Sequence, residues 1–205
     1  MVNKKGLLLV VSGPSGAGKG TICKELLNRN DQIKLSVSAT TRKPRNGEVD
    51  GVNYFFLEKE KFTQMIDNGE FLEYAQIYDN FYGTPKAAIM ECLEKGQDVI
   101  LEIEMQGAKQ IKDVCPDGVF IFVLPPSLEE LKNRIVGRGT ETKEEIDKRF
   151  SCAFEEINRI NDYDYFVVND DLEKSVREVE SIISSEKNKV TRYKNNIIAK
   201  FKEEM

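Results

Sequence analysis

A chain of 205 residues with 40% hydrophobic residues is long enough for one compact unit with a substantial core. Its 30 Lys and Arg residues and 35 Asp and Glu residues give a formal net charge of −5, which argues against a protein that holds nucleic acid over a long basic face. The chain has no histidine, so the Ser-His and Cys-His nucleophile arrangements are excluded, and any catalysis depends on Lys, Arg, carboxylates or a metal.

The first expected element is a strand at residues 7–11, a continuous apolar run that ends at Ser12 and Gly13. Such runs are typical of strands buried on both faces. The run is shorter than the roughly 7–15 apolar residues of a secretory signal. No other stretch approaches the roughly 20 apolar residues of a membrane span. We therefore expect a cytoplasmic protein with no membrane partner.

Strand and helix patterns alternate along the rest of the chain. Further short apolar runs predict strands at residues 99–103, 119–124 and 166–168. Helical patterns lie at residues 20–27, 85–95, 106–114, 128–136, 143–160 and 172–187, and residues 186–205 predict a solvated helix with a frayed end. This alternation predicts an α/β protein with a parallel sheet flanked by helices.

Two segments interrupt the alternation. Residues 36–84 are polar and aromatic, with turn signals and a short helical pattern at residues 59–68, and they predict an inserted, partly β subdomain. Residues 127–160 are a highly charged helical pair joined by a glycine-containing stretch, and they predict a mobile helical lid. The core then consists of about residues 1–35, 85–126 and 161–205.

The turn after the first strand has the composition of a loop that binds nucleotide phosphates. It consists of Gly13, Pro14, Ser15, Gly16, Ala17, Gly18, Lys19, Gly20 and Thr21. A strand, a glycine-rich turn and a helix together aim several backbone N–H groups and the positive end of the helix dipole at one place. Lys19 adds a cation for the β- and γ-phosphates. The loop therefore predicts a P-loop NTPase-type sheet that binds a nucleoside triphosphate.

One position of this loop departs from the strict pattern. Gly20 follows the lysine where the pattern has a Ser or Thr that binds Mg²⁺, and the first hydroxyl comes at Thr21. Mg²⁺ dehydrates reluctantly and keeps several waters. We therefore expect Mg²⁺ to be held mainly by water and the phosphates, with Thr21, Glu102 and Glu104 as candidate protein ligands.

The inserted segment has candidates for a second binding site. Arg42 and Arg45 are placed to bind one phosphate from two sides, and the phenol of Tyr54 is a further donor. Glu73 and Thr84 bring a carboxylate and a hydroxyl. Taken singly, each of these residues is equally well explained as an ordinary surface or half-buried side chain.

Taken together, these motifs resemble those of the guanylate kinase family. The resemblance covers about residues 7–171 and includes Val37-Ser38-Ala39-Thr40-Thr41-Arg42, Gly69-Glu70-Phe71-Leu72-Glu73, Tyr82-Gly83-Thr84, Gln106-Gly107-Ala108 and Asn169-Asp170. It implies an enzyme of purine nucleotide metabolism that transfers the γ-phosphate of ATP to GMP, and to dGMP. It also implies ATP and GMP as the binding partners, with the choice between monomer and homodimer left open.

The resemblance also implies how GMP is bound. Its phosphate is expected to contact Ser38, Arg42, Arg45, Tyr54 and Tyr82, and its guanine to contact Glu73, Thr84 and Glu104. The chemistry agrees, because the N1–H and N2–H donors of guanine need a carboxylate and its O6 needs a hydroxyl. Adenine lacks that donor pair, so AMP would leave the carboxylate unpaired. Family members usually carry Asp at position 104, and the longer Glu moves the carboxylate outward.

For the ATP side, the resemblance implies that Arg134, Arg138 and Arg149 of the lid close over the phosphates. Arg134 is also expected against the adenine, together with Asn169 and Asp170. These arginines, with Lys19 and a bridging Arg42, are the expected catalytic groups, since phosphoryl transfer depends on positioning and charge neutralisation. The alternative for the lid arginines is pairing with glutamates on the helix surface.

Two other functions remain open at this level. One is another nucleoside monophosphate kinase, or a sugar-phosphate kinase, on the same scaffold. The other is a guanylate-kinase-like domain that binds proteins and has lost catalysis. The intact loop with Lys19 and the full arginine set favour an enzyme.

Overall fold

The computed structural model describes residues 5–77, 79–136 and 143–203, with side chains for all of them except 143–149. Within these residues the centre of the molecule is a five-stranded parallel sheet in the order β2-β7-β1-β8-β9. Its strands are β1 (Leu8–Ser12), β2 (Ile33–Leu35), β7 (Asp98–Glu102), β8 (Val119–Leu124) and β9 (Tyr165–Val168). All five residues of β1 are buried, as expected for a central strand covered on both faces. The predicted fold class is confirmed.

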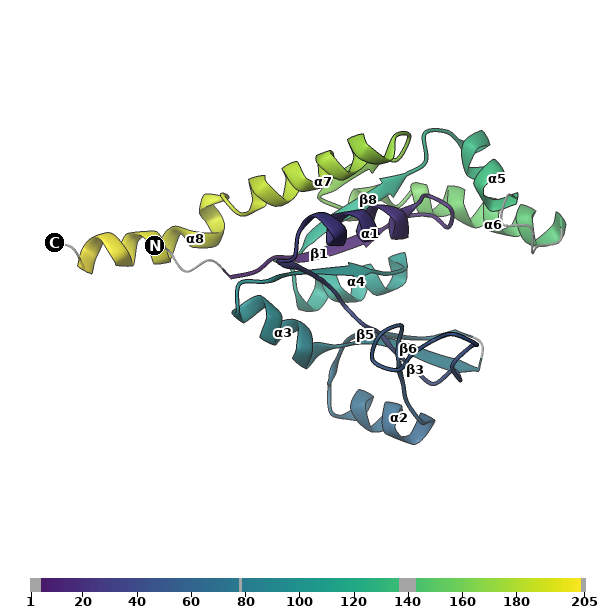
Figure 1. Ribbon diagram of the computed structural model, residues 1–205, viewed down its shortest axis with the longest axis horizontal. Coiled ribbons are helices and arrows are strands. Elements are labelled where there is room, and N and C mark those ends of the chain that lie inside the picture. Colours follow the sequence, from purple (N-terminus) through teal and green to yellow (C-terminus); the bar gives the residue numbers. More distant parts are fainter. Residues whose placement is uncertain (1–4, 78, 137–142, 204–205) are drawn as a thin grey trace.

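Helices cover both faces of this sheet. One face packs against α1 (Lys19–Arg29) and α7 (Leu172–Glu186), and the other against α3 (Lys86–Glu94) and α4 (Met105–Val114) (Figure 1). Side chains of β1 alternate between the two cores, with Leu9 on the α1 side and Val10 on the α4 side. The side chain of Asp171 accepts a 2.8 Å hydrogen bond from the backbone N–H of Lys174 and so caps the start of α7.

A second, four-stranded sheet is formed by residues 39–85, in the order β4-β3-β6-β5. Its strands are β3 (Ala39–Thr40), β4 (Phe55–Phe56), β5 (Phe71–Ile77) and β6 (Asn80–Pro85). The helix α2 (Lys59–Asp67) packs on this sheet through the fully buried ring of Phe62, whose centroid is 4.4 Å from that of Phe71 and 5.5 Å from that of Phe81. This aromatic cluster gives the second sheet its own small core.

Two further helices, α5 (Leu128–Val136) and α6 (Lys143–Ile157), pack on each other through Leu131, Ile135 and Ala153. The predicted helix over residues 143–160 is too long, since α6 ends at Ile157 and a 3₁₀ turn, η1 (Ile160–Asp162), follows. The chain must leave the helix here to enter β9. Asp164 makes two hydrogen bonds to Phe120 at this point. Its backbone N–H donates to the Phe120 carbonyl, and its carboxylate accepts the backbone N–H of Phe120, both at 2.9 Å.

The strand β2 was not predicted. It lies at the edge of the sheet beside β7, and only Ile33 is buried, while Lys34 and Leu35 are exposed. An edge strand of three residues needs no apolar run, so the hydrophobic pattern does not reveal it.

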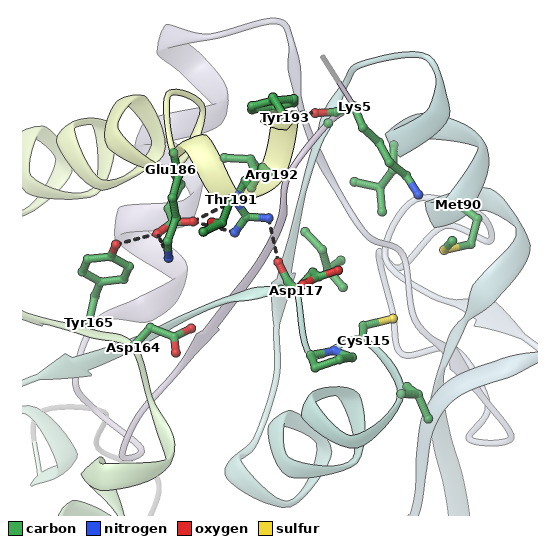
Figure 2. Close-up of a pocket in the computed structure, with 18 residues that line it drawn as sticks. Lys5, Met90, Cys115, Asp117, Asp164, Tyr165, Glu186, Thr191, Arg192 and Tyr193 are labelled. Carbon is green, nitrogen blue, oxygen red and sulfur yellow. Dashed lines mark hydrogen bonds and ion pairs between the residues drawn. The ribbon is translucent and has the colours of Figure 1, made fainter. Parts of the chain in front are cut away.

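The turn between α7 and α8 (Val190–Glu203) is fixed by a buried carboxylate (Figure 2). Glu186 is 2% exposed and accepts hydrogen bonds from the Tyr165 hydroxyl at 2.6 Å, Lys189 at 3.1 Å and Arg192 Nε at 2.9 Å. Arg192 also donates to the backbone carbonyl of Asp117 at 2.8 Å. This Glu186 cluster borders a cavity of roughly 710 Å³ at the amino ends of the core strands.

Over the described ranges no helix is long and apolar enough to cross a membrane.

Candidate active site

A glycine-rich loop joins the carboxyl end of β1 to α1. Gly13, Gly16 and Gly18 all have positive φ angles, of 141°, 92° and 92°. The Lys19 ammonium bends back over the loop and donates to the carbonyls of Gly13 at 2.6 Å and Pro14 at 3.2 Å. The first turn of α1 follows directly, so its N–H groups and dipole point at the same place as the lysine.

Each of these glycines also makes room for a different part of the scaffold. A side chain at position 13 would bring its Cβ within 2.3 Å of the carbonyl of Val123 on β8. At position 16 the Cβ would lie 3.1 Å from Leu131 of α5, and at position 18 it would lie 2.1 Å from the amide nitrogen of Asn169 after β9. The loop is therefore enclosed by three elements that are far apart in the sequence.

Gly20, which stands where the strict pattern has a hydroxyl, lies beside Glu102 at the end of β7. A Cβ at position 20 would be 3.2 Å from a carboxylate oxygen of Glu102, so the missing side chain makes room for this carboxylate. Glu102 is an exposed residue at the end of β7, but the protein groups packed around its carboxylate displace water and raise its pKa; the nearby Lys19 ammonium lowers it and Glu104 raises it. Glu104 itself is exposed, at the N-cap of α4, and Thr21 is exposed on α1.

The second sheet brings three of the predicted phosphate-binding residues together. Arg42 forms a two-pronged ion pair with Glu48, with both N–O distances 2.9 Å, and its guanidinium lies 5.5 Å from the ring centroid of Tyr54. The ring of Tyr82 meets Tyr54 edge to face at 6.1 Å. The pKa of Glu48 is held below its usual range by its hydrogen bonds to Arg42 and to the backbone N–H of Arg45.

The remaining two predicted phosphate ligands lie on the same segment. Arg45 has an exposed side chain, and Ser38 is half-buried just before β3, where its carbonyl accepts the N–H of Phe55 at 2.9 Å. Glu48 was missed as a site residue. Its contact with Arg42 depends on the turn that brings residues 45 and 48 together, and a lone surface glutamate gives no local signal of that kind.

The pair predicted to recognise guanine is assembled between β5 and β6. The Thr84 hydroxyl donates to the Glu73 carboxylate at 2.5 Å, and both residues are buried. The other carboxylate oxygen lies against Gly107 of α4, where a Cβ would come within 2.9 Å of it. A register shift between Phe71 and Glu73 interrupts the β5–β6 pairing at this point. Bulges of this kind re-aim side chains beside binding sites.

Burial raises the pKa of the Glu73 carboxyl, and the hydrogen bond from Thr84 partly offsets this. Next to it in the chain, Tyr74 is bound by Gln110 of α4. The Gln110 amide accepts the backbone N–H of Tyr74 at 3.2 Å and donates to its carbonyl at 3.1 Å. Since β5 is an edge strand, Gln110 completes hydrogen bonds that no neighbouring strand makes. Gln110 was also missed, because only the fold brings it to a strand 36 residues away.

On the lid side, Arg134 of α5 is partly buried. It forms an ion pair with Glu130 at 2.8 Å, which is the pairing with a glutamate on the helix surface that the sequence left open. It also donates to the backbone carbonyl of Asn169 at 3.0 Å. Asn169 is buried and bonds to the loop through Ala17, and Asp170 beside it is exposed. Arg138, and the side chain of Arg149 on α6, lie outside the described residues.

A central parallel strand that leads into such a loop and then a helix defines a P-loop NTPase. Residues 5–186 match the family model described as guanylate kinase, and the chain belongs to the guanylate kinase family. It is an ATP:GMP phosphotransferase, which phosphorylates GMP with ATP as co-substrate. The predictions of family, activity and small-molecule substrates are confirmed.

Individual relatives agree with this assignment. A guanylate kinase of Clostridioides difficile is 82% identical over 205 residues, which is all of both chains. One of Caldanaerobacter subterraneus subsp. tengcongensis is 55% identical and covers 99% of this chain and 98% of its own. The crystal structure of guanylate kinase from Anaplasma phagocytophilum has a TM-score of 0.74 at 34% identity and covers 94% of this chain and 92% of its own.

Proposed function

We propose that this enzyme binds ATP at residues 13–21 and GMP against the second sheet, and that the γ-phosphate passes between them. In this assignment residues 36–84 form the GMP-binding part and residues 127–160 the lid. The core is about residues 1–35, 85–126 and 161–205. The position of the glycine-rich loop at the carboxyl edge of the parallel sheet supports the ATP side, because such sheets bind ligands at that edge.

The buried pair of Glu73 and Thr84 is the observation that carries the assignment of the GMP side. A buried carboxylate that receives one hydroxyl hydrogen bond from the part of the chain that the structure describes retains acceptor positions for the N1–H and N2–H of guanine. When GMP binds, the Thr84 hydroxyl would turn its single proton from Glu73 to O6 of the base, and Glu104 is a further acceptor for the base. A nucleobase without the donor pair would leave the remaining acceptor positions of the buried Glu73 carboxylate unpaired, which penalises AMP.

The GMP phosphate is assigned to Ser38, Arg42, Arg45, Tyr54 and Tyr82. The ion pair with Glu48 supports this role for Arg42, because it holds the guanidinium in a fixed orientation before the phosphate arrives. A rigid, planar guanidinium suits the two-pronged recognition of a phosphate. Arg42 is also the group assigned to bridge the donor and acceptor phosphates.

Catalysis in this proposal depends on positioning and on neutralising negative charge. Lys19 contacts the β- and γ-phosphates once its ammonium leaves the carbonyls of Gly13 and Pro14. The lid residues Arg134, Arg138 and Arg149 close over the ATP phosphates, and Arg134, Asn169 and Asp170 line the adenine region. Closure of the lid also excludes water, which would otherwise compete with GMP for the phosphoryl group.

The residues beside the loop fit a Mg²⁺ ion that keeps most of its waters. Glu102 lies against Gly20 at the start of α1, with Lys19 and Glu104 near it, so carboxylate oxygens stand next to the phosphate site. We assign Glu102 and Glu104 to the Mg²⁺-bound waters and Thr21 as a further ligand. When bound there, Mg²⁺ would neutralise negative charge on the ATP phosphates. The described residues contain no cluster of three or more His, Cys, Asp or Glu side chains that could bind a metal ion by themselves.

The proposal includes a cytoplasmic enzyme with ATP and GMP as partners and without nucleic acid or membrane partners, as monomer or homodimer. The net charge of −5 supports the absence of a nucleic-acid surface.

A coupled assay of ADP release with GMP, AMP, UMP and CMP tests the site assignment when it is repeated with Glu73→Gln. The wild-type enzyme is expected to use GMP far better than the other three. The variant is expected to lose most of the preference for GMP over AMP, by about 10²-fold or more. An unchanged preference in the variant would show that another residue recognises guanine.

A further inference from the structure

The side chain of Asn169 reaches the phosphate loop rather than open space. Its amide nitrogen donates to the backbone carbonyl of Ala17 at 2.8 Å. A Cβ at position 18 would come within 2.1 Å of the same nitrogen, so the amide is packed directly against Gly18. Asn169 is 8% exposed, and little of its surface is left to contact a nucleotide base.

Three contacts fix the orientation of this asparagine. Its backbone N–H donates to the carbonyl of Leu124 at 2.8 Å, which continues the pairing of β9 with β8. Its amide oxygen faces the hydroxyl of Ser175, a fully buried residue of α7, at 3.4 Å. Its backbone carbonyl accepts the Arg134 guanidinium at 3.0 Å. The amide group therefore has its oxygen towards α7 and its NH₂ group towards the loop.

The bond to Ala17 has a geometric consequence for the loop. The peptide group between Ala17 and Gly18 is planar and trans, so its C=O and its N–H point in opposite directions. When Asn169 holds the Ala17 carbonyl on one side, the Gly18 N–H must face the other side. Gly18 is the N-cap of α1, where free N–H groups and the helix dipole are directed at the phosphate site.

We propose that Asn169 is a positioning residue for the phosphate loop: it holds the Ala17 carbonyl so that the Gly18 N–H is aimed at the triphosphate. Its effect on ATP binding is then exerted through the phosphates and does not depend on the adenine. This inference rests on the proposed ATP site and changes the role of Asn169 within it. It also makes Asn169 the point where the loop, the α7 helix and the lid residue Arg134 meet.

The test uses a ligand that has phosphates and no base. Affinities for ATP and for inorganic tripolyphosphate are measured by calorimetry for the wild-type protein, Asn169→Asp and Asn169→Ala. Asn169→Asp keeps the shape and places an oxygen against the Ala17 carbonyl, and Asn169→Ala removes the bond without that repulsion. In each variant the affinity for ATP and the affinity for tripolyphosphate are expected to fall by the same factor, about tenfold or more. The KM for GMP is expected to stay the same.

Other results would overturn the inference. If ATP binds more weakly while tripolyphosphate binds as before, Asn169 acts on the adenine; if neither affinity changes, it has no positioning role. Asp170→Asn provides the comparison, since this exposed neighbour is expected to affect ATP alone. Ser175→Ala, which leaves the amide in place but removes the hydroxyl facing it, is expected to give a smaller loss with the same pattern, so the inference remains testable if both Asn169 variants fail to fold.

A Lys19→Met arm separates this inference from the proposed function. If Lys19→Met leaves tripolyphosphate binding unchanged, the loop does not hold the phosphates and the proposed ATP site is wrong. If Lys19→Met abolishes binding and the Asn169 variants behave as wild type, the ATP site stands and only the positioning role fails. Thermal unfolding of each variant is measured alongside, and affinities are compared only below the onset of unfolding.

Discussion

The hydroxyl of Thr84 donates a 2.5 Å hydrogen bond to the carboxylate of Glu73, across neighbouring strands of the second sheet. The bond holds one carboxylate oxygen, and Gly107 leaves room for the other. The position of the carboxylate is therefore set by β6 and α4 as well as by its own strand.

This arrangement predicts that Thr84→Val raises the KM for GMP by about tenfold, since the variant keeps the shape and removes one hydrogen bond to a charged group. The KM for ATP is expected to stay the same. Steady-state kinetics with each substrate varied in turn measure both constants. An equal rise in the two KM values would point to a general loss of structure instead.

The raised pKa of Glu73 predicts how GMP binding depends on pH. The carboxylate form accepts the guanine donors, so affinity is present above this raised pKa and is lost as the pH falls through it. The loss therefore starts at a higher pH than for an ordinary glutamate. Calorimetric titration of GMP across acidic pH measures it. The same series on Glu73→Gln isolates the titration of the GMP phosphate, and an identical profile in both proteins would contradict the prediction.

Lys19→Met is expected to lower kcat by about 10²–10³-fold, because it removes a cation from the transferring phosphoryl group. Among the described residues the ammonium of Lys19 bonds to the loop carbonyls of Gly13 and Pro14 alone, so the unfolding temperature is expected to change little. Single-turnover kinetics and thermal unfolding measure the two effects. A variant that retains wild-type turnover would place the ATP phosphates elsewhere.

Gln110→Ala is expected to raise the KM for GMP by about threefold to tenfold, since it releases β5 next to Glu73. The matched control is Lys112→Met on the same helix. Its side chain bonds to the carbonyl of Asp162, away from β5. The control is expected to leave the KM for GMP unchanged. If both variants raise it alike, the effect comes from α4 as a whole and not from the hold on β5.

Glu186→Ala is expected to lower the free energy of unfolding by about 3 kcal/mol, because it leaves the partly buried Arg192 guanidinium without its carboxylate partner. Activity below the unfolding temperature is expected to persist, since the Glu186 cluster lies at the opposite edge of the sheet from the loop. Glu173→Ala is the control on the same helix. Its ion pairs are exposed, and its loss is expected to cost about 0–1 kcal/mol.

The same residue makes a prediction about acid stability. Burial disfavours the charge on Glu186, but hydrogen bonds from Tyr165, Arg192 and Lys189 outweigh it and lower its pKa to about 2. The stabilisation is therefore complete above the unfolded-state pKa of 4.5 and is lost as the pH falls towards 2. Urea unfolding between pH 7 and pH 2 should show this decline in the wild type and a shallower one in Glu186→Ala.

Much of the fold follows from local patterns. The strand at residues 119–124 and the helix at residues 128–136 have the predicted bounds, because a buried apolar run and a helical period are contained within the segment itself. The edge strand β2 has no such run. The helical pattern of residues 143–160 also does not show that the chain leaves α6 at Ile157 and passes through η1 towards β9, where Asp164 contacts Phe120.

The candidate site divides in the same way. The phosphate loop is a continuous stretch, so its composition alone indicates its shape. The roles of Glu48, Gln110 and Gly107 depend on what faces them in three dimensions. Asn169 was placed near the adenine by family resemblance, and its hydrogen bond to Ala17 becomes visible only in the folded chain.

The packing of the loop glycines against β8, α5 and the turn after β9 links nucleotide affinity to the completion of folding. A chain that stops before Asn169 lacks one wall of the loop. Triphosphate binding is therefore a property of the finished core, and a ligand that binds only the native state shifts the folding equilibrium of the whole core towards it. In a cell well supplied with ATP, the donor substrate would thus also protect newly made enzyme from unfolding and proteolysis.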